Sequence, residues 1–258
     1  MPDHPIFTAV RAFDVEALRR ELEAGVDPDT SEDGICASTP LCQAVQWGSA
    51  IPATRFHERL ECIAVLLEAG ASVDKQCGFG NTPLLKAAGV DSPAWTAVIA
   101  ALLEAGADPN FTTTRWGESV LATAASMGSA GTVRMLLSAG AVDLDRALES
   151  AIETGKQRNC TLLLRAGAAI PWHQSWHVYE GTVGPGPDPQ TLAYISRIRA
   201  TWGGFKAYEK AHRQHLAAIF LAKFPALPVE MLERIVEFSY NCGGPSNCPS
   251  IAPKYLLD

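Results

Sequence analysis

A five-residue phrase that returns five times constrains the fold of this chain more than any other feature. It reads Leu-Glu-Ala-Gly-Ala at residues 67–71 and 103–107. Copies with small changes occupy residues 22–26, 137–141 and 164–168. Similarity at a period of roughly 20 to 50 residues is typical of repeat proteins, in which each copy is one structural unit. We therefore interpret residues 6–171 as a series of five units.

Each copy of the phrase predicts the end of a helix. The residues before the third copy show apolar side chains at helical spacing, for instance Val98, Ile99 and Leu102. Gly106 then stands where the helix must stop, because glycine adopts the left-handed conformation of a helix C-terminus without steric cost.

A second recurring phrase predicts where the other helix of each unit begins. Thr39-Pro40-Leu41 and Thr82-Pro83-Leu84 have the form hydroxyl, proline, leucine, and Ser119-Val120-Leu121 is a degraded copy. A hydroxyl can cap free backbone amides, and proline is tolerated in the first helical turn. Each unit should therefore contain a helix, a turn, a second helix and a loop.

The spacing inside the units predicts two insertions. Ser119 and Gly140 are 21 residues apart, whereas Thr82 and Gly106 are 24 apart and Thr39 and Gly70 are 31 apart. The insertions of 3 and 10 residues are expected in the turns between helices, near residues 91–93 and 48–57. Small alanines should let one unit approach the next, at Ala44, Ala87, Ala88, Ala124, Ala125 and Ala151.

These phrases resemble the ankyrin repeat, whose pattern is Gly-x-Thr-Pro-Leu-His, paired alanines, and then Leu-Leu-x-x-Gly-Ala. The resemblance implies an all-α solenoid of about five helix-turn-helix repeats over residues 1–171. The histidine of the family pattern is replaced by Cys42, Leu85 and Ala122, so we expect somewhat looser units. The first and last copies lack the Thr-Pro phrase and are expected to act as caps.

The resemblance also implies a function, because ankyrin repeats commonly bind other proteins through their loop tips and the first helices of their units. The corresponding loops here are residues 29–34, 75–80 and 111–117. Two tips carry an aromatic residue before a glycine, and aromatic residues often anchor interfaces; the alternative is that both rings pack on a neighbouring loop. The candidate partner-binding residues are Glu32, Asp33, Trp47, Lys75, Phe79, Phe111, Arg115 and Trp116.

Charge narrows the kind of partner. The formal net charge is −7, and residues 1–171 carry 13 Lys and Arg against 21 Asp and Glu. An acidic surface repels a phosphate backbone, so we expect a protein partner and no nucleic acid. The chain has no stretch of 18 apolar residues and no signal-peptide pattern, and its seven cysteines show no pairing pattern. We therefore expect a monomer in the cytoplasm or nucleus, with no membrane contact.

The repeat pattern stops after Pro171. Residues 172–189 are rich in glycine and proline and are expected to be a linker, and residues 190–258 a helical C-terminal region. Helices are predicted over residues 190–201, 205–224 and 228–241.

The third of these helices suggests an alternative function. It begins Leu-Pro-Val-Glu-Met-Leu, similar to the opening of F-box motifs, and its position after the repeats is similar to that of a SOCS box. Both are docking modules for ubiquitin-ligase scaffolds. The alternative is therefore a substrate-recognition adaptor of a ubiquitin ligase, docked through Leu227, Pro228, Leu232 and Ile235.

No residues form a recognisable catalytic or cofactor-binding motif, so we expect no enzyme, no cofactor and no metal. Zinc would require three pairs to converge, namely His173 with His177, His212 with His215, and Cys242 with Cys248. None has the spacing of a known zinc finger, and a metalloenzyme built on them is the third hypothesis. Cations such as Arg197 and Lys206 are interleaved with an acid and predict a solvated helix face.

Overall fold

A computed structural model describes residues 4–32, 38–46, 55–114, 117–170, 188–201 and 204–223 of the chain. The side chains of residues 215, 216 and 218–223 are outside this description. The chain divides into two compact units, Met1–Trp176 and His177–Asp258.

The first unit is built from helices that follow one another in pairs. The pairs are α1 (Pro5–Ala12) with α2 (Val15–Glu23), α3 (Pro40–Ala44) with α4 (Phe56–Glu68), α5 (Pro83–Ala88) with α6 (Trp95–Glu104), α7 (Val120–Ser126) with α8 (Ala130–Ser138), and α9 (Leu144–Glu153) with α10 (Gln157–Ala166).

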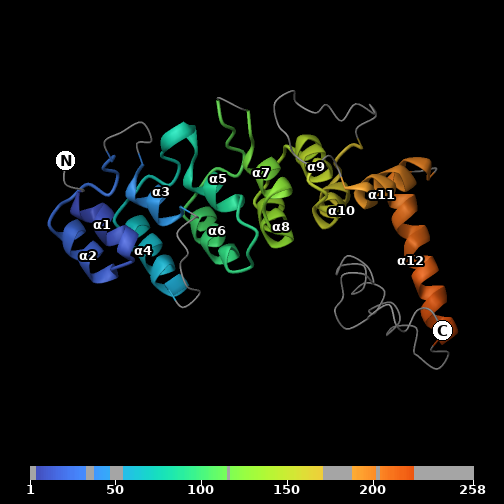
Figure 1. Cartoon of the computed structure of the whole chain (residues 1–258), viewed down its shortest axis with the longest axis horizontal. Helices are drawn as coiled ribbons and strands as arrows, with labels where there is room; N and C mark the ends of the chain where they lie inside the picture. Colours follow the sequence, from blue (N-terminus) through green and yellow to red (C-terminus); the bar gives the residue numbers. More distant parts are fainter. Residues whose placement is uncertain are drawn as a thin grey trace. The chain divides into compact units, whose positions relative to one another are not determined.

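The first helices of the pairs form one row and the second helices form another (Figure 1). Within a row, each helix packs on the next, as α5 does on α7 and α6 on α8. The predicted stack of five two-helix units is confirmed.

The hydroxyl phrases begin helices as predicted. The side chains of Thr39, Thr82 and Ser119 each accept a hydrogen bond from the backbone N–H three residues later, at 3.2, 3.3 and 3.1 Å. Each cap satisfies a backbone amide that the first helical turn leaves without a partner. The three hydroxyls are buried, so a missing cap could not be replaced easily by water.

The glycines of the other phrase end helices as predicted. Gly70 and Gly106 have φ of +86° and +91°, a region that side chains rarely enter. This left-handed conformation points the backbone N–H of the next residue back towards the helix. Ala71 therefore donates to the carbonyl of Leu66 and Ala107 to that of Leu102, both at 3.0 Å. The chain thereby leaves each second helix in the same direction.

The core lies between the two rows and between successive pairs. Its large members are leucines and isoleucines such as Leu66, Leu84, Ile99 and Leu136, each with no exposed surface. The alanines that were predicted to let one unit approach the next are also fully buried, at Ala44, Ala87, Ala88, Ala124, Ala125 and Ala151. Because no single pair could bury these residues alone, stacking provides the stability of the unit.

Two pairs approach each other closely at Gly128, in the turn between α7 and α8. A Cβ on this residue would lie 2.8 Å from the carbonyl oxygen of Ala124 and closer still to that of Ala88. Both neighbours are backbone atoms, which cannot rotate away. This turn therefore requires glycine.

A ladder of side-chain acceptors joins consecutive units at their loops. Asp29, Asp74 and Asn110 each stand four residues after a helix-ending glycine. Each accepts the backbone N–H that stands two residues after the next such glycine, with distances of 2.9 Å to Ser72, 3.1 Å to Asp108 and 3.0 Å to Val142. A fourth rung joins Asp145 to the N–H of Ala169 at 2.7 Å.

One charged side chain is buried between three units. Arg59 of α4 is 3% exposed, and its guanidinium carbon lies 4.9 Å from the ring centroids of both Phe13 and Trp95. It donates from Nη1 to the carbonyl oxygen of Gln46 at 3.2 Å. Burial lowers the pKa of Arg59. Attraction between the cation and the two ring faces offsets part of the cost of removing the charge from water.

Both predicted insertions fall between the helices of a pair. Residues 89–94 separate α5 from α6, and residues 45–55 separate α3 from α4. The expected boundary of the longer insertion was wrong by two residues, because Phe56 and His57 are the first residues of α4. Phe56 is held there by an edge-to-face contact with Trp95, with ring centroids 6.2 Å apart.

The second unit contains α11 (Pro189–Ala200) and α12 (Gly204–Lys223), close to the first two helices predicted after the linker. The two helices meet through Tyr194 and Tyr208, whose ring centroids lie 5.8 Å apart at 80°. The predicted helix over residues 228–241 lies outside the described residues. In the part of the chain that is described, no helix has the length and apolar character needed to cross a bilayer.

Candidate functional site: the loop tips of the stacked helices

The loop between the second and third pairs forms a tight hairpin. The backbone N–H of Cys77 donates to the carbonyl of Asn81 at 2.9 Å, and the N–H of Gly80 donates to that of Cys77 at 2.8 Å. Gly78–Gly80 makes a single 3-10 turn at the tip. This hairpin extends beyond the row of first helices, on the side away from the second helices (Figure 1).

Phe79 stands at the tip of this hairpin in an unfavourable conformation. Its φ is +68°, a left-handed value that costs a non-glycine residue roughly 1 kcal/mol or more. Its side chain is 60% exposed, whereas Phe7, Phe13 and Phe205 are at most 9% exposed. Most of the ring surface is therefore in solvent.

The next loop forms a second hairpin, between α6 and α7. The N–H of Thr113 donates to the carbonyl of Glu118 at 2.9 Å, and the N–H of Val120 donates to that of Phe111 at 3.2 Å. Phe111 is half-buried at the base of this hairpin. Phe111 therefore lies at the base of the loop and not at its tip.

Lys75 connects two loops. Its ammonium donates to the backbone carbonyl of Asp29 at 2.7 Å, across the gap between consecutive units. The carboxylate of Asp29 also accepts from the N–H and the hydroxyl of Ser72. Of the candidate residues, Lys75 therefore has a structural contact that sequence reasoning did not anticipate.

Glu32 lies in the first of the three loops and pairs with Arg11 of α1. Its backbone N–H donates to the carbonyl of Ser38 at 3.0 Å, which closes the base of that loop. The remaining candidates, Asp33, Trp47, Arg115 and Trp116, lie outside the described residues. The four candidate residues that the structure describes lie on consecutive loops on one side of the stacked helices. They are Glu32, Lys75, Phe79 and Phe111.

The charge of these loops is mainly negative. Six carboxylates of the described loops are exposed or half-buried, at Asp27, Asp29, Glu32, Asp74, Asp108 and Glu118. Burial raises the pKa of Asp74, and the N–H of Asp108 opposes this by donating to its carboxylate.

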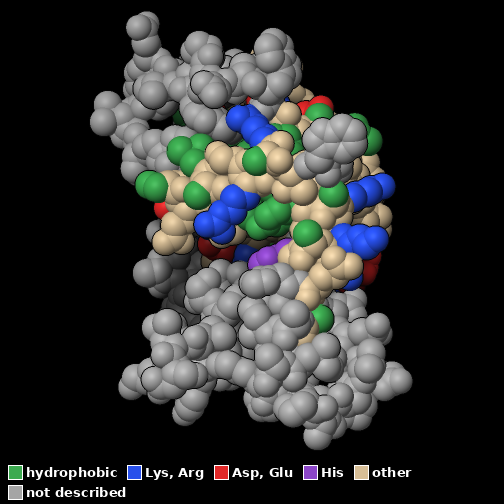
Figure 2. All heavy atoms as spheres, turned by 90° about the vertical axis from the view of Figure 1, so that its right-hand side faces the viewer, with side chains coloured by type: hydrophobic (Ala, Val, Ile, Leu, Met, Phe, Trp, Pro, Cys, Tyr) green, Lys and Arg blue, Asp and Glu red, His purple; other side chains and the backbone are tan. Residues whose placement is uncertain are grey.

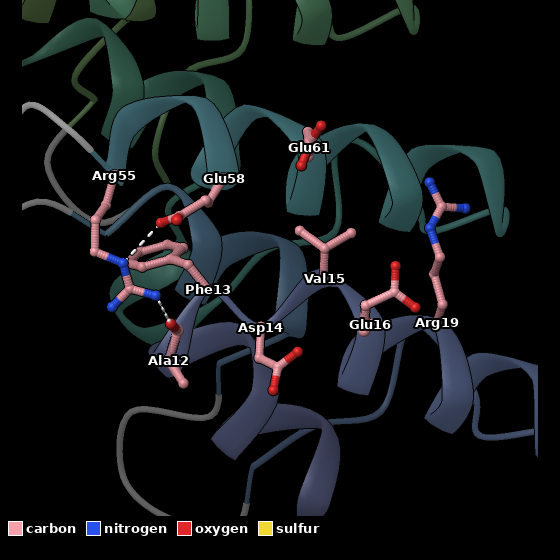
Figure 3. A pocket seen from close by; sticks show the side chains of 9 residues that line it. All are labelled: Ala12, Phe13, Asp14, Val15, Glu16, Arg19, Arg55, Glu58 and Glu61. Carbon is pink, nitrogen blue, oxygen red and sulfur yellow. Dashed lines mark hydrogen bonds and ion pairs between the residues drawn. The ribbon is translucent and has the colours of Figure 1, made fainter.

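A cleft of about 680 Å³ lies elsewhere on the unit, where the turn between α1 and α2 meets α4 (Figure 3). Its walls carry Asp14, Glu16, Glu58 and Glu61. Arg55 lies across one end, where it donates to Glu58 at 2.7 Å and to the carbonyl of Ala12.

Local structure accounts for much of the polar lining of this cleft. Asp14 accepts from the N–H of Ala17 at 2.9 Å and so caps α2. Glu58 is the ion-pair partner of Arg55. We therefore do not assign a ligand to the cleft.

The structure describes only some of the C-terminal residues that are candidates for zinc binding or ligase docking. His212 stacks on Tyr208, with ring centroids 5.9 Å apart at 5°. The residues that would complete a zinc site or dock a ligase lie outside the described residues or side chains, at His173, His177, His215, Leu227, Pro228, Leu232, Ile235, Cys242 and Cys248. Within the described ranges, no group of three His, Cys, Asp or Glu could hold a metal ion.

The cations of α11 and α12 are solvated. Arg197, Arg199, Lys206, Lys210 and Arg213 are exposed. Arg213 pairs with Glu209 one turn away, at 3.1 Å. The face drawn in Figure 2 shows lysine and arginine side chains at several places at the surface. The exposure of these five cations agrees with the predicted solvated face.

Comparison with known proteins identifies one family. Residues 51–145 match the family model described as ankyrin repeats, in three copies. The matched segment contains α4 through the start of α9 and both hairpins described above. No curated protein matches the chain.

Proposed function

Because this chain is an ankyrin-repeat protein, we propose that it is a scaffold that binds a partner protein through its loop tips and first helices. Ankyrin repeats support protein binding in general, and the hairpin at residues 77–81 supports this particular surface. The observation that carries the proposal is Phe79, which is both exposed and held at a positive φ.

Phe79 is unfavourable to the free protein in two ways. A left-handed phenylalanine destabilises the folded chain, and an exposed ring lowers its solubility. Glycine at the same position would remove both costs, and glycine already stands on either side. A contact with a partner explains why an aromatic residue occupies the tip, because burying the ring would stabilise a complex.

The chemistry around Phe79 defines the partner that would fit. Carboxylates lie on the same loops as the hairpins, including Asp74 and Asp108. We propose a partner segment with an apolar pocket for the ring and basic residues around it. The acids would mainly increase the association rate, and the ring would mainly slow dissociation.

The test is to place a photo-crosslinking phenylalanine analogue at position 79 of the full chain and to irradiate it in cells. A matched control carries the analogue at Met127, a 46% exposed apolar residue that lies between α7 and α8, away from the loops. We expect a specific adduct from position 79 and none of the same mass from position 127.

Affinity then measures the contribution of the ring. For the partner recovered in this way, Phe79→Ala should weaken binding about 10-fold or more, whereas Met127→Ala should leave it unchanged. Equal adducts from both positions, or binding that is insensitive to Phe79→Ala, would contradict the proposed surface.

The ligase-adaptor alternative depends on the sequence of residues 227–238 alone. Its test is the double change Leu232→Glu with Ile235→Glu in the full chain. Selective loss of ligase components from the captured complex, with the crosslinked partner retained, would support it. Unchanged capture of all components would exclude this docking helix.

A further inference from the structure

Charge is distributed unevenly over the row of second helices. The exposed side of α2, α4, α6, α8 and α10 is called the outer face here. Counting Asp, Glu, Lys and Arg, α2 contains five charged residues and α4 contains four. In contrast, α6 contains only Glu104 and α8 contains only Arg134. The middle of the row is therefore poor in charge.

This middle part of the outer face is an apolar surface. α6 and α8 lie close together here, since a Cβ on Gly131 of α8 would be 3.1 Å from Cγ2 of Thr96. An apolar surface that spans two packed helices is typical of an interaction site. Its exposed or half-buried apolar side chains are Ala97, Ala100, Ala101, Ala130 and Met135.

The charges on the two sides of this apolar centre are opposite. The glycine that follows each second helix gives a common reference position. Nine residues before it, α4 has Glu61 and α10 has Arg158, and both are exposed. Two residues before it, α4 has the exposed Glu68 and α10 has the half-buried Arg165. Because the repeats stack in the same orientation, the acids of α4 and the bases of α10 lie at the same levels along their helices.

This order of charges is self-complementary about one two-fold axis. An axis parallel to the helices and between α6 and α8 lays α6 of one copy on α8 of the other, and α4 on α10. The rotation leaves the level along each helix unchanged. Glu61 therefore meets Arg158 of the second copy, and Glu68 meets Arg165. Each contact occurs twice, as in an isologous dimer.

The charges of the central helices fit the same axis. Arg134 is level with Ala100, one helical turn before Glu104. Across the axis, Arg134 would therefore lie within one turn of Glu104 of the second copy. Both side chains are exposed, and neither forms an ion pair with any residue in the described part of the chain.

A two-fold axis along the row fits the charges poorly. It would lay α4 on α4 and α10 on α10, so acids would face acids and bases would face bases. Contacts between like charges disfavour association. The charge order therefore selects the axis parallel to the helices.

We propose that the outer face is a homodimer interface, in which α6 and α8 of two copies pack together and α4 of each copy pairs with α10 of the other. The apolar centre would supply most of the affinity, and the charged pairs would set the register. The proposal concerns the second helices and not the loop tips, so it is independent of the proposed function. It replaces the monomer expected from the sequence.

Sedimentation velocity of the full chain tests association. Between about 1 and 100 µM, the mass should rise from that of the 27.6-kDa chain towards twice that value. Ala97→Glu places a carboxylate on the exposed apolar centre and should weaken dimerisation about 10-fold or more. Ala24→Glu is the matched control, because Ala24 is an exposed alanine at the end of α2, outside the proposed contact. It should leave the dissociation constant unchanged, and circular dichroism should show that both variants are folded.

Charge reversal tests the register. Glu61→Arg and Arg158→Glu, made singly, each bring like charges face to face twice in a dimer. Each variant alone should therefore associate about 10-fold more weakly than the native chain. An equimolar mixture of the two should recover the native affinity, because the altered contact then joins opposite charges and the other contact is native. Recovery that requires mixing cannot come from a contact within one chain.

Three results would overturn the proposal. The first is a mass that stays at that of one chain over the whole concentration range. The second is a dimer that Ala97→Glu weakens no more than Ala24→Glu does, which would place the contact elsewhere. The third is a mixture of the two folded charge-reversal variants that associates no better than either variant alone, which would exclude the pairing of α4 with α10.

Discussion

The turn at Gly128 and the hairpin tip at Phe79 are both sharp reversals of the same repeat domain, and they are built in opposite ways. The turn is enclosed by backbone carbonyls of two units, and a single added carbon would collide with them. The tip carries a large ring in solvent at a backbone angle suited to glycine. Glycine thus occurs at position 128, where steric contact requires it, and phenylalanine occurs at position 79, where the backbone angle favours glycine.

This difference separates two tasks of the chain. Residues on the helix side hold the stack together, so substitutions there should change stability strongly and binding only indirectly. Residues at the loop tips have few contacts to lose, so substitutions there should change binding and leave stability nearly unchanged or improved. Point substitutions in the two regions should therefore affect stability and binding differently.

Gly128→Ala should lower the free energy of unfolding by about 3 kcal/mol, because the new Cβ meets the carbonyl of Ala88 and cannot be accommodated by side-chain rotation. Urea denaturation followed by circular dichroism measures the change. Gly131→Ala in α8 is the matched control, since its Cβ meets only side chains and alanine favours the helix. Equal losses from both variants would contradict the close approach at residue 128.

Asn159→Ala should cost about 2 kcal/mol. The buried side-chain amide of Asn159 donates to the carbonyl of Ala125 at 2.9 Å and lies 3.5 Å from those of Ala124 and Gly128. Truncation would leave these carbonyls without their partner in a place that water reaches poorly. Arg134→Ala on the exposed face of α8 should change stability by less than about 0.5 kcal/mol. The same denaturation experiment compares the two.

Asp74→Ala should cost about 1 kcal/mol, since the N–H of Asp108 would lose its acceptor. Asp74→Asn should instead be slightly more stable than the native chain at pH 7, by less than about 0.5 kcal/mol, because water screens a carboxylate that is only partly buried. Asparagine keeps the acceptor, and its amide can donate, as Asn110 does one unit later to Gly140 at 3.2 Å.

The pH dependence of this pair has a definite sign. Burial raises the pKa of Asp74 above its ordinary value of 3.8. The carboxyl therefore contributes most to stability below that value, and the contribution is lost as pH rises through the folded-state pKa. The advantage of Asp74→Asn should thus shrink as pH falls towards 4. An advantage that grows on acidification would show that the carboxylate is stabilised by its surroundings.

Phe79→Gly should raise the free energy of unfolding by about 0.5 kcal/mol. Relief of the left-handed phenylalanine slightly exceeds the added entropy of glycine in the unfolded chain. Thermal unfolding measures the gain, and the same variant should lose partner binding. Stability that falls by 1 kcal/mol or more would mean that the ring supports the fold, and the separation of tasks would fail at this residue.

Much of the repeat region follows from its sequence, because each local signal has a local cause. The caps at Thr39 and Thr82 and the helix end at Gly70 depend on residues within one turn of them. These features do not require knowledge of which units lie side by side.

Contacts between units were harder to anticipate. The interaction of Lys75 with Asp29 joins residues 46 positions apart, and nothing near either residue indicates it. Arg59 has no local signal for burial, since its two aromatic neighbours come from other units. The ladder could have been found, because Asp29, Asp74 and Asn110 occupy the same place in their repeats.

The ladder between loops also affects how the array tolerates change. Each acceptor binds a main-chain amide, which every residue except proline provides, so the joint does not depend on the side chain of the receiving unit. A whole repeat could therefore be deleted or inserted, and the same hydrogen bond would form between the repeats that become neighbours. An array joined in this way can change its length while the residues that face a partner vary independently.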